Sequence, residues 1–130
     1  MRRRGESLRL SVFKGRDARL NRAIFEALAL KGPSTVYEIY RHVRTRRVFR
    51  RKLYSVVNRR VRSLVHQGYL RRVGERTTKA GFKAALYGLS AKAYLAILLS
   101  QINLEEAIER ADEETLTELI ITLLKLMGQI

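Results

Sequence analysis

The stretch between residues 48 and 67 constrains the fold most, because it combines the apolar periodicity of a helix with a basic opposite side. On a helical wheel its apolar residues gather within about 80° of Leu53, and they are Phe49, Val56, Val57, Val61 and Leu64. The opposite side carries polar and basic residues, namely Arg51, Ser55, Asn58, Arg59, Arg62 and His66. Gly68 follows as a typical helix stop. We therefore predict one helix over 48–67 that packs through one face and leaves the other in solvent.

Two shorter helices are predicted upstream. Asp17 is a favourable N-cap residue, and the helical spacing of apolar residues after it continues to Gly32, which Pro33 follows. Thr35 and Glu38 have the spacing of a capping box, in which each side chain accepts a hydrogen bond from the backbone amide of the other residue. The second helix would have only two turns before a turn at residues 44–47, so it needs support from tertiary packing.

After Gly68 the pattern changes from helix to strand. Segments 69–73 and 82–87 are short and contain aromatic and β-branched residues. Segment 74–81 between them is polar, carries basic residues and is bracketed by glycines. This order predicts a β-hairpin with a basic tip.

The charge of the chain is strongly asymmetric. Lys and Arg number 27 against 12 acidic residues, for a net charge of +15. Residues 1–100 hold 25 basic and 5 acidic side chains, whereas residues 101–130 hold 2 basic and 7 acidic side chains. Such a concentration of positive charge repels itself in a compact fold, and a bound polyanion relieves the repulsion. Nucleic acid is the first polyanion to consider and an anionic membrane surface the second, while an Arg-rich surface linked with thermostability is the alternative without a ligand.

Residues 1–16 are predicted to form a basic arm. Leu8, Leu10 and Val12 alternate with polar residues, which favours a short strand. Three consecutive arginines, Arg2, Arg3 and Arg4, are expected to contact DNA, in the minor groove if the arm reaches it.

Residues 101–130 are predicted to be an acidic helical tail. Ser90 is the expected N-cap of a preceding helix with Ala93, Ile97 and Leu98 facing inward. Asn103 and Asp112 are expected to cap two further helices. The last helix carries an apolar stripe made of Leu116, Leu119, Ile120, Leu123, Leu124 and Met127. Because apolar residues cover well over half of its circumference, we expect this stripe to form a homodimer, the alternative being that the tail completes the core of its own protomer.

The sequence resembles small prokaryotic and archaeal transcription regulators of the winged helix-turn-helix fold. The resemblance rests on two segments, Val57 to Arg72 and Leu86 to Lys92. In the first, the predicted recognition helix ends in a short stretch that runs from a leucine to a glycine. It covers about residues 17–100. It implies a mainly α fold with a small β-hairpin wing and, here, additional C-terminal helices. It also implies that helix 48–67 enters the major groove of DNA while the wing at 69–88 reaches phosphates or the adjacent minor groove.

The residues expected to bind DNA follow from this placement. On the predicted helix, Arg51, Arg59 and Arg62 suit guanine or phosphate, Asn58 suits adenine, and Tyr54 and Ser55 suit phosphate or a thymine methyl. The expected backbone clamps are Arg44, Arg46 and Arg47 in the turn and Arg71, Arg76, Thr77, Thr78 and Lys79 in the wing. Arg60 points toward the apolar face, so we expect a structural arginine that either extends its charged end to solvent or pairs with an acid such as Glu26 or Glu38.

The remaining residue types argue against an enzyme. There is no cysteine, no glycine-rich phosphate loop and no convincing set of catalytic side chains. His42 and His66 have no second metal ligand near them in sequence, so neither a metal nor another cofactor is expected. The favoured function is sequence-specific binding of double-stranded DNA by a soluble cytoplasmic, nucleoid-associated regulator. Binding of structured RNA, a role as a nucleoprotein accessory factor, and a winged-helix protein-interaction module stay open as alternatives.

Overall fold

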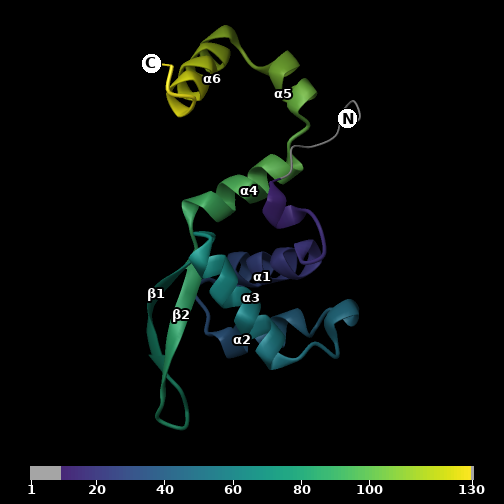
Figure 1. Ribbon diagram of the computed structural model, residues 1–130, viewed down its shortest axis with the longest axis vertical. Helices are drawn as coiled ribbons and strands as arrows, with labels where there is room; N and C mark the ends of the chain where they lie inside the picture. The colour runs from purple at the N-terminus through teal and green to yellow at the C-terminus, as the bar shows by residue number, and fades with distance from the viewer. Residues whose placement is uncertain (1–9, 130) are drawn as a thin grey trace. The chain divides into compact units, whose positions relative to one another are not determined.

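A computed structural model describes residues 10–129 of the protein. These residues are mainly helical and include one two-stranded antiparallel hairpin (Figure 1). The helices are α1 (Ala18–Lys31), α2 (Val36–Val43), α3 (Tyr54–His66), α4 (Ala91–Gln101), α5 (Leu104–Arg110) and α6 (Glu113–Leu126). The strands are β1 (Leu70–Thr77) and β2 (Lys83–Leu89), and two 3-10 turns are η1 (Ser11–Phe13) and η2 (Arg47–Phe49). The expected combination of helices with a small hairpin is therefore confirmed.

Helices α1, α2 and α3 share one hydrophobic core. Its fully buried side chains include Ile24 from α1, Ile39 from α2, and Val57, Val61 and Leu64 from α3. The three α3 residues recur at helical spacing, so this helix contributes one apolar face to the shared core. The predicted inner face of the third helix is confirmed at these three α3 positions.

Local signals explain where α1 and α2 begin and end. Gly32 ends α1 with φ of 76°, a conformation that costs glycine little. The capping box of α2 is present, because the Glu38 amide donates to Thr35 Oγ1 at 3.2 Å and the Thr35 amide donates to Glu38 Oε1 at 3.0 Å. Asp17 precedes α1 as predicted, but its side chain makes no capping hydrogen bond.

The prediction that the third helix begins at Val48 is wrong. Residues 47–49 form η2, a turn follows, and Leu53 stands in an extended conformation as the N-cap of α3. Phe49 is still buried, but Leu53 is 65% exposed. The short turn directs Phe49 into the core. In the sequence, Phe49 therefore has the spacing of the apolar face of α3 although it does not belong to that helix. Arg51 consequently lies before α3 and not on it.

The hairpin is longer than predicted. The strands pair from Leu70 opposite Leu89 to Thr77 opposite Lys83, which reduces the loop to residues 78–82. The register shifts between Arg72 and Gly74, which leaves Val73 as the extra residue of a β-bulge. Gly74, which the sequence had indicated as the start of the loop, pairs with Leu86.

A short bridge attaches the hairpin to the helices. Ser34, in the connection between α1 and α2, pairs with Tyr87 of β2, and each amide donates to the carbonyl of the other residue at 2.9–3.0 Å. Ser34 therefore acts as a one-residue third strand, and its contact fixes the root of the hairpin beside the start of α2.

The segment from Leu10 to Arg16 is not a free arm. It contains η1 in place of the predicted strand, and Val12 and Phe13 are buried in the core. The buried amide of Asn21 on α1 donates to the Val12 carbonyl at 2.8 Å. The predicted arm therefore does not extend to residue 16, while Leu8 and the three arginines Arg2, Arg3 and Arg4 lie outside the described residues.

The chain divides into two compact units, with the division between residues 100 and 101. In the first unit, Ser90 Oγ accepts from the Ala93 amide as the N-cap of α4, and Ala93 is buried as expected. Leu98 is exposed, contrary to the prediction, because α4 buries only a narrow face. In the second unit, Asn103 caps α5 and Asp112 caps α6 as predicted. Among residues 10–129, no helix combines the length and apolarity needed to cross a bilayer.

Candidate nucleic-acid interface

The outer face of α3 presents polar and basic side chains. Ser55, Arg59 and Arg62 are exposed and Asn58 is half-buried, while the opposite face of the same helix lies in the core. Within the described chain, neither Arg59 nor Arg62 forms an ion pair. Their guanidinium groups therefore remain available to an external acceptor.

The basic residues before α3 differ in their surroundings. Arg44 donates to the Arg50 carbonyl and to the Tyr40 hydroxyl, each at 3.0 Å, so it braces the turn that leads into α3. Arg46 forms an ion pair with Glu26 of α1. Arg47 and Arg51 are exposed, and neither side chain has an ion pair or a hydrogen bond with a described residue. Both guanidinium groups therefore have donors available to an external acceptor.

Arg60 behaves as a structural arginine. Its side chain donates to Asp17 at 2.8 Å and to Ser63 at 2.7 Å, which connects the start of α1 to the middle of α3. The sequence correctly indicated an acidic partner, but the predicted partners Glu26 and Glu38 are wrong. Glu26 pairs with Arg46, and Glu38 pairs with Arg76.

The hairpin supplies a second group of basic and hydroxyl side chains. Arg71, Thr77 and Lys79 are exposed, and Thr78 Oγ1 accepts from the Phe82 amide to close the tip. Arg76 forms an ion pair of 2.5 Å with Glu38, so its charge is already partly compensated within the protein.

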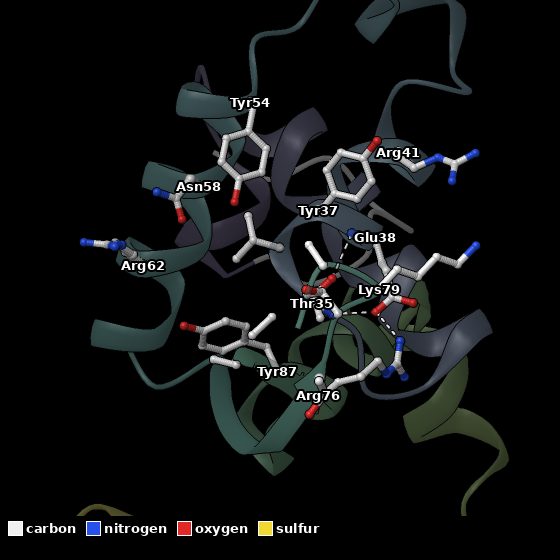
Figure 2. Close-up of a pocket in the computed structure, with 16 residues that line it drawn as sticks. Thr35, Tyr37, Glu38, Arg41, Tyr54, Asn58, Arg62, Arg76, Lys79 and Tyr87 are labelled. Carbon is white, nitrogen blue, oxygen red and sulfur yellow. Dashed lines mark hydrogen bonds and ion pairs between the residues drawn. The ribbon is translucent and has the colours of Figure 1, made fainter. Parts of the chain in front are cut away.

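A groove of about 740 Å³ brings residues of α2, α3 and the hairpin together (Figure 2). In this view Tyr54 and Tyr37 lie on the upper side of the groove, and Arg76 and Tyr87 lie on the lower side. The groove therefore joins the two predicted contact regions, the outer face of α3 and the hairpin, into one concave surface. The site residues predicted from the sequence that line it are Tyr54, Asn58, Arg62, Arg76, Thr77, Thr78 and Lys79.

Three polar or aromatic groove residues on α2 were not predicted as site residues. Tyr37 is 57% exposed and lines the groove. Arg41 and Glu38 line the same groove from α2. The helical spacing of α2 places residues 37, 38 and 41 on its side away from Ile39, which is a signal that the sequence did contain.

Glu38 is the acidic residue of this basic groove. Partial burial alone would raise the pKa of its carboxyl group, but hydrogen bonds from the Thr35 amide and from Arg76 outweigh burial and lower the pKa below its ordinary value. Glu38 therefore stays ionised, completes the capping box of α2 and forms the ion pair with Arg76 of the hairpin.

The residues predicted to form a dimer all lie on or directly after α6. Leu119, Ile120, Leu123 and Met127 are exposed, Leu116 and Leu124 are half-buried, and α6 has no buried residue. The apolar stripe is therefore present, and four of its six residues are exposed.

No family model, curated protein or solved structure matches the chain.

Proposed function

We propose that the protein is a winged helix-turn-helix protein that binds double-stranded DNA and regulates transcription. In this proposal α3 enters the major groove and the hairpin serves as the wing. The observation that carries it is the groove that Asn58 and Arg62 of α3 line together with Arg76 and Lys79 of the hairpin. The order of α1, α2, α3 and the hairpin, together with the bridge between Ser34 and Tyr87, supports the same assignment.

The side chains of α3 suit the recognition of bases. Arginine binds guanine through two hydrogen bonds, and an asparagine amide matches the donor and acceptor of adenine. Arg59, Arg62 and Asn58 provide these groups on the outer face of the helix. Arg71, Thr77 and Lys79 would then bind phosphates, which position the protein without discriminating between sequences.

A second copy of the chain is the proposed partner. The apolar stripe of α6 is largely exposed, and monomers rarely leave an apolar surface of this kind in water. The tail is also negatively charged, so it does not compete with the basic surface for phosphate. A two-fold dimer would present two recognition helices about 34 Å apart, or a multiple of that, and would select a palindromic site. The place of action would be the cytoplasm, at the nucleoid.

Selection of bound duplexes from a random pool tests this function. We expect a palindromic sequence to be enriched, and Arg62→Ala or Asn58→Ala to relax the preference at one position by about 1–3 kcal/mol. Lys79→Ala should weaken binding to all sequences alike. Arg19→Ala is the matched control, because Arg19 is an exposed arginine of α1 outside the groove.

Three outcomes would contradict the proposal. Preference for a structured RNA over every duplex would favour the RNA alternative. A monomer in sedimentation at micromolar concentration, or a dimer that survives removal of residues 103–130, would refute the role given to α6.

A further inference from the structure

The groove between α2, α3 and the hairpin contains aromatic surface that phosphate binding does not require. Tyr37 is 57% exposed and Tyr54 is 44% exposed, and both line the groove. Tyr40 packs against each of them, with ring centroids 6.1 Å from Tyr37 and 5.4 Å from Tyr54. The two exposed rings are therefore held in place by a third ring.

The groove also has an apolar lining. Val36, Ala84 and Ala85 contribute to it beside Tyr87. Small apolar residues and the faces of aromatic rings offer no donor to a phosphate, but they fit the flat face of a nucleobase.

Cationic side chains surround this apolar surface. Arg41, Arg62 and Lys79 line the groove and form no ion pair with described residues, while Arg76 is held by Glu38. Aromatic rings beside unpaired cations are the combination by which proteins bind single-stranded nucleic acid, because bases stack on the rings and phosphates bind the cations.

We propose that this groove binds an unpaired nucleotide, with its base stacked on Tyr37 and its phosphate bound by Arg62 or Lys79. The inference rests on the proposed function, since it uses the same cationic surface. In an intact duplex the faces of the bases are covered by their neighbours, so only an extruded or single-stranded base reaches the tyrosines. The half-buried Asn58 amide lies in the same groove and offers hydrogen bonds to the edge of such a base.

The test compares two DNA duplexes that differ by one bulged 2-aminopurine nucleotide, using the full chain. We expect the bulged duplex to bind about tenfold more tightly than the fully paired one, and the 2-aminopurine fluorescence to be quenched by stacking. Tyr37→Ala should remove most of both effects, and Tyr37→Phe should retain them because it keeps the ring. Tyr94→Ala is the control, since Tyr94 is a comparably exposed tyrosine of α4 outside the groove.

The outcomes separate this inference from the proposed function. Equal affinity for both duplexes without quenching would overturn the inference and leave duplex binding intact. Binding of the bulged nucleotide or of a single strand without binding of any paired duplex would support the inference and overturn the proposed function. Loss of the preference in Tyr94→Ala as well as in Tyr37→Ala would overturn the assignment to this groove.

Discussion

Replacing Arg60 by methionine should destabilise the fold without weakening DNA binding. The Arg60 side chain is 17% exposed and its partner Asp17 is 50% exposed. Methionine keeps most of the aliphatic length of arginine but removes the hydrogen bonds to Asp17 and Ser63. The change therefore isolates the polar contacts between α1 and α3.

The size of the effect follows from this partial exposure. An exposed ion pair contributes about 0.2–1 kcal/mol, and a hydrogen bond from a charged group adds a contribution of similar order. Water replaces the lost partner at the half-exposed Asp17, so we expect a total loss of about 1 kcal/mol. In a helical unit of this size that loss lowers the melting temperature by about 4–8 °C.

Thermal unfolding and DNA binding of the same variants provide the assay. Arg59→Met is the matched control, because Arg59 is an exposed neighbour on α3 without an ion pair in the described chain. We expect Arg60→Met to lower the melting temperature and to leave DNA affinity unchanged. We expect Arg59→Met to lower DNA affinity and to leave the melting temperature unchanged. An Arg60→Met protein with unchanged stability and reduced DNA affinity would refute this reasoning.

Two further predictions concern α2. Thr35→Ala should cost about 1 kcal/mol in urea unfolding because the capping box is lost, and an unchanged midpoint would contradict the role of the cap. Burial, and secondarily the charge of Lys31, lowers the pKa of His42 below its ordinary value of 6.5. The unfolded chain therefore binds the proton more readily, so stability should fall as the pH drops below about 6.5. His42→Gln should reduce this dependence, and an unaltered pH profile would contradict it.

Local features of the fold could be predicted from the sequence. The capping box of Thr35 and Glu38, the stop at Gly32 and the caps at Asn103 and Asp112 depend on residues within a few positions of each other. The inner face of α3 was also predictable, because helical periodicity alone defines it.

Features that depend on distant contacts could not be predicted. The bridge between Ser34 and Tyr87 joins segments far apart in the chain, and no local pattern marks it. The partner of Arg60 was missed for the same reason, since Asp17 lies 43 residues away. The start of α3 was misplaced because the turn before it keeps Phe49 in the core at an apparently helical position.

The salt dependence of duplex binding tests the central claim most directly. If each protomer neutralises roughly 6–8 phosphates, the logarithm of the affinity should fall against the logarithm of the salt concentration with a slope of about −5 to −7. Lys79→Ala should flatten the slope by about one unit, whereas Arg19→Ala should leave it unchanged. A slope near zero for the wild-type protein would contradict the account.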